Sequence, residues 1–282
     1  MELTSIRTIK NIAASFGFDF SKGLGQNFLT DDGVLLKIAE AASGTEGVLE
    51  IGPGFGVLTR ELSKTFERVV SIEIDKSLLP VLDYTLSDCN NVKIVNADFM
   101  KINLSQLIDE EFSSKKISVA ANLPYYITTP IVTELIEKKY NIENIVIMVQ
   151  KEVAERFCAL PGTKEYGAIS VLCNYYTKPE IICKVPADRF YPKPNVDSAV
   201  VRMKVCEKPN TYAKDEKVFF KIVKAAFAQR RKTLLNCLAN GLGRDKAEIS
   251  QILESVGIDP TIRGERLGID EFAAICNAMC DM

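Results

Sequence analysis

Residues 47–75, GVLEIGPGFGVLTRELSKTFERVVSIEID, decide the fold class of this chain. An apolar run at 47–51 leads into a glycine-rich turn, and an amphipathic segment at 57–64 precedes a second β-branched run at 68–74. A strand, a tight turn, a helix and a strand in this order are typical of parallel sheets, because a helix carries the chain back between two parallel strands. The stretch therefore predicts a βαβ unit.

The same alternation continues to residue 150. Further strands are expected at 91–97, 117–121 and 144–149, and further helices at 76–87 and 130–140. Helices that alternate with strands cover both faces of one sheet. We therefore expect an α/β fold with a doubly wound, mostly parallel sheet, which binds its ligands beyond the carboxyl ends of the strands.

Beyond residue 150 the pattern changes twice. Three more apolar runs predict strands at 168–176, 180–185 and 196–205. The periodicity then becomes helical, with helices expected at 216–239, 246–256 and 270–279. We expect two domains, a larger one at 1–207 and a small, all-helical one at 208–282.

Composition is that of an ordinary globular protein, with 47% hydrophobic and 26% charged residues in 282. The N-terminus lacks the apolar core of a signal peptide, and the chain contains no run of about 18 apolar residues. A cytoplasmic location without membrane contact is therefore expected. Eight cysteines form no Cys-x-x-Cys pair and there is no histidine, so we expect no metal site and no imidazole base.

Positive charge is concentrated in one part of the chain. Residues 189–232 hold 12 basic and 4 acidic residues, a net charge of +8, which leaves −10 elsewhere because the total is −2. Local basicity of this kind fits contacts with a phosphate backbone, although a solvated lysine-rich face is the alternative. The candidate RNA-binding residues, four of them expected on one helical stripe, are Lys217, Lys221, Lys224 and Arg231, with Arg230 and Lys232 beside them.

The glycine-rich turn is the candidate cofactor site. Gly52 and Gly54 let the backbone turn tightly and approach a ligand ahead of a helix N-terminus. Glu73 follows at the end of the next strand, where its carboxylate can accept both hydroxyl hydrogens of a ribose. Val57 replaces the last glycine of the dinucleotide fingerprint, which disfavours a pyrophosphate cofactor. The pattern therefore predicts a nucleoside ligand.

A second carboxylate, Asp98, follows the third strand and is suited to accept from the amino group of an adenine. An aspartate that only caps a turn is the alternative at this position.

The candidate catalytic residues are Asn122, Leu123, Pro124 and Tyr125, which follow the fourth strand. The amino nitrogen of adenine is a poor nucleophile, because its lone pair is delocalised into the ring. Hydrogen bonds from that amino group to the Asn122 side-chain oxygen and the Leu123 carbonyl would aim the lone pair at a methyl donor. Proline stiffens the turn, and Tyr125 can stack on an extruded base. We expect Thr129 to cap the next helix, with Pro130 at its first position.

With these motifs the chain resembles the ribosomal RNA adenine N6,N6-dimethyltransferase family. Residues 22–29, KGLGQNFL, resemble its N-terminal signature, in which Asn27 and Leu29 would contact the cofactor, and Gly52, Glu73, Asp98 and Asn122 match further cofactor positions. Residues 189–200, RFYPKPNVDSAV, resemble a later motif in which Phe190 would sandwich the target base against Tyr125. Residues 226–234, AFAQRRKTL, resemble the start of the helical domain in the small-subunit branch.

This resemblance implies a Rossmann-like methyltransferase fold that uses S-adenosyl-L-methionine, with the helical domain binding RNA or the ribosome. It implies dimethylation of two adjacent adenosines in a hairpin loop near the 3′ end of 16S rRNA, within the small subunit or its precursor. No obligate protein partner is evident, and we expect a monomer. Three alternatives stay open: the sibling branch that methylates 23S rRNA and confers macrolide resistance, a non-enzymatic RNA-binding assembly or transcription factor, and a less favoured nicotinamide-dependent dehydrogenase.

Overall fold

The computed structural model describes residues 2–18 and 27–281. Contacts divide the chain into two compact units. Unit 1 comprises Met1–Ala154 and Glu180–Val205, and unit 2 comprises Glu155–Pro179 and Cys206–Met282. The second unit thus includes residues 155–179, which precede the boundary expected near residue 207. The division of the chain into two domains at that residue stays a prediction.

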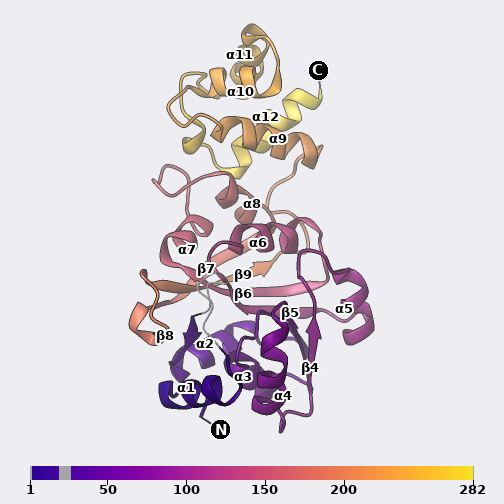
Figure 1. Ribbon diagram of the computed structural model, residues 1–282. Helices are drawn as coiled ribbons and strands as arrows, with labels where there is room; N and C mark the ends of the chain where they lie inside the picture. The colour runs from indigo at the N-terminus through magenta and orange to yellow at the C-terminus, as the bar shows by residue number, and fades with distance from the viewer. Residues whose placement is uncertain (1, 19–26, 282) are drawn as a thin grey trace. The chain divides into compact units, whose positions relative to one another are not determined.

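A seven-stranded sheet organises unit 1, and it confirms the expected α/β fold (Figure 1). Its strands, from one edge to the other, are β4 (Val92–Asn96), β3 (Arg68–Glu73), β2 (Gly47–Ile51), β5 (Ile117–Asn122), β6 (Ile142–Gln150), β9 (Ser198–Val205) and β7 (Thr177–Val185). Neighbours from β4 to β6 are parallel, whereas β9 is antiparallel to β6. The interior strand β2 is buried along its whole length, as expected for a parallel strand covered on both faces.

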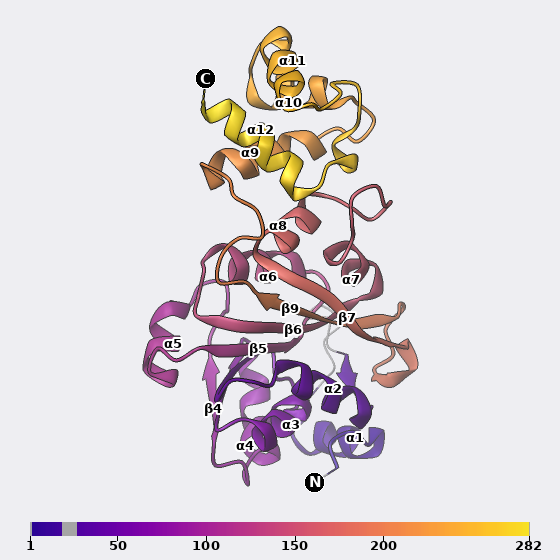
Figure 2. The same ribbon diagram turned by 180° about the vertical axis from the view of Figure 1, so that it is seen from behind.

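Helices flank this sheet, and Figures 1 and 2 show α1 to α4 gathered on one side of it and α6 on the other. The helices of unit 1 are α1 (Ile6–Ser15), α2 (Asp32–Ala42), α3 (Val57–Thr65), α4 (Leu79–Thr85), α5 (Leu104–Phe112) and α6 (Thr128–Glu137). Among the described residues, the unit also contains the 3₁₀ turns η2 (Lys76–Leu78) and η3 (Ala187–Arg189) and a small sheet of β1 (Phe28–Leu29) with β8 (Phe190–Tyr191). Helix α7 (Lys151–Phe157) follows directly after β6.

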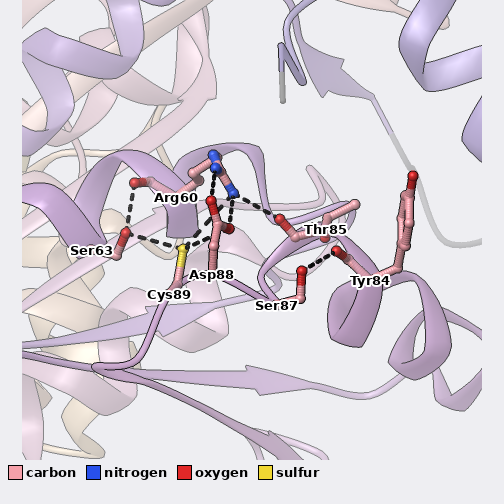
Figure 3. Close-up of polar contacts among 7 residues, drawn as sticks. All are labelled: Arg60, Ser63, Tyr84, Thr85, Ser87, Asp88 and Cys89. Atoms are coloured by element: carbon pink, nitrogen blue, oxygen red, sulfur yellow. Dashed lines mark hydrogen bonds and ion pairs between the residues drawn. The ribbon is translucent and has the colours of Figure 1, made fainter.

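Arg60 ties α3, the helix behind the glycine-rich turn, to the end of α4 (Figure 3). Its Nη1 donates to the Thr85 carbonyl at 2.9 Å and to Asp88 Oδ1 at 2.6 Å, while its Nη2 donates to Asp88 Oδ2. The guanidinium lowers the pKa of Asp88 to about 2. Gly56 begins α3 with φ +78°, and a Cβ there would meet Leu86 at 3.1 Å. The start of α3 is therefore fixed by α4, which lies beside it.

Residues 168–176 are a helix, α8 (Ala168–Tyr176), and the expected strand is wrong. Six of its nine residues are buried, so apolar residues occur all around the helix and no 3.6-residue period is visible. Gly167 begins the helix, and its amide N–H is bound by the Ser170 hydroxyl at 3.1 Å. A short, uniformly apolar run does not distinguish a buried helix from a buried strand.

The expected helix at 216–239 is two helices, α9 (Glu216–Phe227) and α10 (Leu234–Leu242). Thr233 begins the second, where its Oγ1 accepts from the Asn236 amide at 3.5 Å, and the Leu234 amide donates to the Ile262 carbonyl at 2.6 Å. Because α9 ends before it, Arg231 does not share the α9 stripe, contrary to expectation. Two more helices, α11 (Lys246–Ser255) and α12 (Ile269–Cys280), follow with the 3₁₀ turn η4 (Gly264–Arg266) between them.

The core of unit 2 forms where α9 crosses its neighbours. Phe219 and Phe272 are fully buried, and their ring centroids lie 6.5 Å apart. Gly241 allows α10 to approach α9 closely, since a Cβ there would come within 2.5 Å of the Ala225 Cβ. Across the described residues of both units, every helix is too short or too polar to cross a bilayer.

Candidate active site

A cavity opens in unit 1 at the carboxyl ends of β2, β3 and β5. The chain leaves β2 toward β3 on one side and returns to β5 on the other, so this is the switch point of the sheet. Ten predicted site residues line the cavity: Asn27, Leu29, Gly52, Gly54, Glu73, Asp98, Asn122, Leu123, Pro124 and Tyr125. The structure thus brings together residues from segments about a hundred positions apart in the chain. Residues 22–26 of the N-terminal signature lie outside the described residues.

The glycine-rich turn forms one wall of this cavity. Gly52 and Gly54 have φ of +71° and +59°, a region that side-chain-bearing residues rarely adopt. A Cβ on Gly54 would lie 2.8 Å from the ring of Phe28, whereas one on Gly52 would meet nothing within 4 Å. The turn therefore needs glycine for its backbone at both positions and for space at Gly54.

Glu73 ends β3 and is 5% exposed. Its Oε1 accepts from the Asp75 amide at 2.8 Å and its Oε2 accepts from the Gly54 amide at 3.2 Å. Burial raises the pKa of Glu73, and these backbone donors oppose the increase. A carboxylate offers about four acceptor positions, so two remain for a ligand, which fits the two hydroxyls of a ribose.

Asp98 lines the cavity and also organises the turn after β4. Its Oδ1 accepts from the Met100 amide at 3.0 Å, and its Oδ2 lies 3.2 Å from the Lys101 ammonium. These contacts agree with the alternative, in which Asp98 caps a turn. Binding of an adenine by the same carboxylate stays a prediction.

Asn122 is the last residue of β5, and its Nδ2 donates to the Asn27 carbonyl at 3.0 Å. A carbonyl only accepts, so this bond decides which end of the amide faces Asn27. The Oδ1 is thereby left as the acceptor end of a side chain that lines the cavity. Leu123, 1% exposed, is anchored by its own amide, which donates to the Met148 carbonyl at 3.2 Å.

Pro124 and Tyr125 form the turn between β5 and α6. The Pro124 carbonyl accepts from the Ile127 amide at 3.2 Å and from the Thr128 hydroxyl at 3.3 Å. Because these bonds start the helix, α6 begins at Thr128 with Ile127 as its N-cap, and the expected cap at Thr129 is wrong. The Tyr125 hydroxyl lies 2.9 Å from Ser198 Oγ, and burial raises the pKa of the phenol, which keeps it neutral.

Phe190 is not in the cavity wall. It is 3% exposed and packs in the hydrophobic core of unit 1, on the strand β8 that pairs with Leu29. The structure does not place Phe190 opposite Tyr125 in the cavity, where the two rings could sandwich a base. That sandwich stays a prediction, and it requires the Phe190 ring to become exposed.

Among the residues that were not predicted from the sequence, three have side chains that can act on a ligand or on Tyr125. Glu50 lines the cavity at 1% exposure, and its signal was a single charge inside an apolar strand. Tyr126 lines the rim and is 64% exposed, a second aromatic ring directly after Tyr125. Ser198, which holds the Tyr125 hydroxyl, gave no local signal because it lies 73 positions away.

The six candidate RNA-binding residues belong to unit 2, and all are exposed. Lys217, Lys221 and Lys224 lie on α9, while the three others lie in the turn at 228–233. Arg230 is partly engaged, since its Nη2 donates to the Lys164 carbonyl at 2.6 Å and lies 4.0 Å from Glu265. Their contact with RNA stays a prediction.

Sequence comparisons identify relatives along nearly the whole chain. A family model described as ribosomal RNA adenine dimethylase matches residues 17–279. The chain is 50% identical over 276 residues to the ribosomal RNA small subunit methyltransferase A of Geobacillus thermodenitrificans, covering 96% of this chain and 94% of that protein. The protein of the same name from Bacillus mycoides is 49% identical over the same shares of both chains.

Solved structures share the fold of this chain. A dimethyladenosine transferase from Plasmodium falciparum superposes with a TM-score of 0.74 at 24% identity, over 88% of this chain and 95% of that one. The 23S rRNA methyltransferase ErmE gives a TM-score of 0.69 at 26% identity, over 90% of this chain and 100% of that one. The chain therefore belongs to the ribosomal RNA adenine dimethylase family of enzymes.

Proposed function

We propose that this enzyme transfers methyl groups from S-adenosyl-L-methionine to the N6 amino groups of two adjacent adenosines in a 3′-terminal hairpin loop of 16S rRNA, during maturation of the small subunit. One observation carries the proposal. Asn122, held by the Asn27 carbonyl at 3.0 Å with its Oδ1 left as an acceptor, lines the same cavity as the ribose-type carboxylate Glu73.

The residues of the cavity fit this cofactor. Glu73 has acceptor positions left for two ribose hydroxyls after binding the Gly54 and Asp75 amides. Gly52 leaves open space where a side chain would otherwise project, so a ligand can approach the backbone there. Asp98 would accept from the adenine amino group. When bound, the cofactor supplies a methyl group already activated by its positive sulfur.

Asn122 and Leu123 would prepare the target nitrogen. The Asn122 Oδ1 accepts one amino hydrogen and the Leu123 carbonyl accepts the other, so the nitrogen pyramidalises and its lone pair turns toward the methyl group. Pro124 fixes the turn that presents this carbonyl. Tyr125, held by Ser198 at 2.9 Å, offers its ring as a platform for an extruded adenine. Because catalysis depends mainly on how the amino group and the methyl group are positioned, the reaction does not require a histidine, and the chain contains none.

The choice of the small-subunit branch rests on the relatives. Proteins about half identical to this chain are named ribosomal RNA small subunit methyltransferase A, whereas ErmE, named for 23S rRNA, is 26% identical. Within this proposal the six cations of unit 2 contact the RNA backbone, and the enzyme works as a monomer in the cytoplasm, where ribosomes are assembled.

The test is transfer of tritiated methyl groups to unmethylated small subunits, with large subunits and free 16S rRNA assayed in parallel. We expect label in the small subunit at the N6 position, and its loss in the Asn122→Ala enzyme. Label found only in large subunits would overturn the branch assignment. A pure protein that shows no saturable binding of S-adenosyl-L-methionine would overturn the enzymatic proposal itself.

A further inference from the structure

Glu50 is a buried acid that the proposed chemistry does not use. It is the one charged residue of β2, lies two positions before Gly52 and is 1% exposed. Despite this burial Glu50 is one of the residues that line the cofactor cavity. An ionisable group in that position requires an explanation, because acids are rarely buried without a partner.

The groups around Glu50 are neutral or acidic. On one side β3 supplies Ser71, whose hydroxyl donates to Glu50 Oε2 at 2.6 Å, and also Glu73. From α3 the buried Thr59 lies close enough to influence the carboxyl, although its Oγ1 makes no hydrogen bond, and on the other side β5 pairs Ala120 with Glu50. Among the described residues, none of the groups that act on Glu50 is a cation. Nothing in the protein itself therefore balances a negative charge at this position.

Burial without a cation favours the protonated acid. It raises the pKa of Glu50 to about 7, against the opposing effect of the Ser71 and Thr59 hydroxyls. Glu73, in the same cavity, keeps two backbone amide donors that favour its charged form. The two acids of this cavity thus differ in their surroundings. Glu73 accepts from backbone N–H groups, whereas Glu50 has hydroxyl groups beside it.

We propose that Glu50 distinguishes the cationic cofactor from its uncharged product, holding a proton in the empty and product-bound cavity and releasing it to solvent when the cofactor binds. The inference rests on the proposed function for the identity of the cofactor. S-adenosyl-L-methionine carries a sulfonium, an ammonium and a carboxylate, a net charge of +1. S-adenosyl-L-homocysteine has lost the sulfonium charge and is neutral overall.

A cation in a cavity wall of low polarity stabilises a neighbouring carboxylate. Binding of the cofactor then converts the Glu50 carboxylic acid to a carboxylate and one proton, which the buffer takes up. Methyl transfer forms a bond from the methyl carbon to the adenine nitrogen and breaks the bond to sulfur, whose electron pair stays on sulfur and cancels the sulfonium charge, while the nitrogen loses one hydrogen as a proton to solvent. The Glu50 carboxylate then regains a proton, and the product loses that attraction. Glu50 therefore weakens retention of the product relative to the cofactor.

Calorimetric titration in pairs of buffers with different ionisation enthalpies counts the protons released on binding. Between about pH 6 and 7 we expect release of about half a proton when S-adenosyl-L-methionine binds, the maximum for a pKa lowered by about one unit, and clearly less with S-adenosyl-L-homocysteine. In Glu50→Gln this release disappears, and preference for the cofactor over the product falls by about tenfold, the equivalent of about one pKa unit. Unchanged affinity of Glu50→Gln for the product shows that the variant is folded.

Two further variants identify the source of the proton. Ser71→Ala removes the hydroxyl that favours the charged form, so the pH at which release is half-maximal should rise, a shift that a packing role for Glu50 would not produce. Glu73→Gln should weaken both ligands but keep the release. Equal proton release by both ligands, or release that persists in Glu50→Gln, overturns the inference and leaves methyl transfer untouched. Absence of any cofactor binding would instead contradict the proposed function.

Discussion

In the cavity of unit 1 the side chains of Glu73, Asn122 and Tyr125 are each held by a polar partner, whereas the six cations of unit 2 are exposed. Of these six side chains, that of Arg230 contacts a carbonyl and a carboxylate. Asn122 is oriented by one carbonyl and Glu73 by two amides, so the cavity depends on direction and distance. Lys217 and Lys221 project from a helix into solvent, where a charge acts through its sign and approximate position. The difference teaches that single atoms should decide function in unit 1, while unit 2 should respond in small, additive steps.

The largest expected effect is that of Asn122→Ala. Removing a positioned acceptor should lower kcat/KM for methyl transfer roughly 100- to 1,000-fold, the range found for single catalytic hydrogen bonds. Binding of small-subunit RNA should change by less than about twofold, because no phosphate contact is lost. Asn122→Asp is the matched control, since it keeps an acceptor but loses the donor to the Asn27 carbonyl. Parallel loss of binding and turnover would remove the contrast between the two regions.

Replacing the buried acid tests the same contrast through stability. The pKa of Glu50 in the fold is about 7 against an ordinary value of 4.5, so the folded protein binds more protons than the unfolded chain between these values. Stability should therefore fall as pH rises through this window, by up to about 3 kcal/mol. Glu50→Gln does not titrate, so the ligand-free variant should be more stable than the native protein at pH 8, with a smaller difference at pH 5. Urea unfolding at the two pH values measures this, and identical curves would contradict the assigned burial cost.

Gly241→Ala probes packing in unit 2 without touching its charges. The new methyl group would lie 2.5 Å from the Ala225 Cβ, so α9 and α10 must separate. We expect a loss of about 1–3 kcal/mol in unfolding free energy, as for other overpacked cores. The dependence of RNA binding on salt, measured on the folded fraction, should stay as it is. A changed salt slope would mean that packing and charge are coupled in this unit.

The smallest effect is expected from Lys221→Ala combined with Arg231→Ala. Loss of two phosphate contacts should weaken RNA binding by about tenfold and lower the slope of log affinity against log salt by about 2. Lys64→Ala with Lys138→Ala removes the same charge from unit 1 and should leave that slope alone. If the salt dependence of RNA affinity is unaltered in the variant that lacks Lys221 and Arg231, these residues are ordinary solvated surface residues.

Sequence alone predicted the positions that lie where strands end. Gly52, Glu73 and Asn122 each follow or end an apolar strand, and parallel strands bring such ends to one edge of the sheet. Orientation could not be predicted, because it depends on distant partners. The carbonyl that fixes Asn122 belongs to Asn27, 95 positions away, and the burial of Phe190 depends on pairing with β1.

Errors in secondary structure have equally physical origins. Residues 168–176 are buried on most sides, which removes the period that identifies a helix. The break at 228–233 contains no glycine or proline, and only Thr233, which begins α10, marked a new helix. Local propensity was overridden there by tertiary bonds such as that from the Leu234 amide to the Ile262 carbonyl.

The bond between Tyr125 and Ser198 has a consequence for the time at which the enzyme becomes active. Ser198 is the first residue of β9, the strand that joins the sheet antiparallel to β6 after a long excursion of the chain. A nascent chain that has emerged only through β6 contains the catalytic residues 122–125, yet it lacks the Ser198 hydroxyl that holds Tyr125. Synthesis from the N-terminus therefore delivers the catalytic residues well before the segment that fixes them, and activity must wait for a late, non-local pairing step.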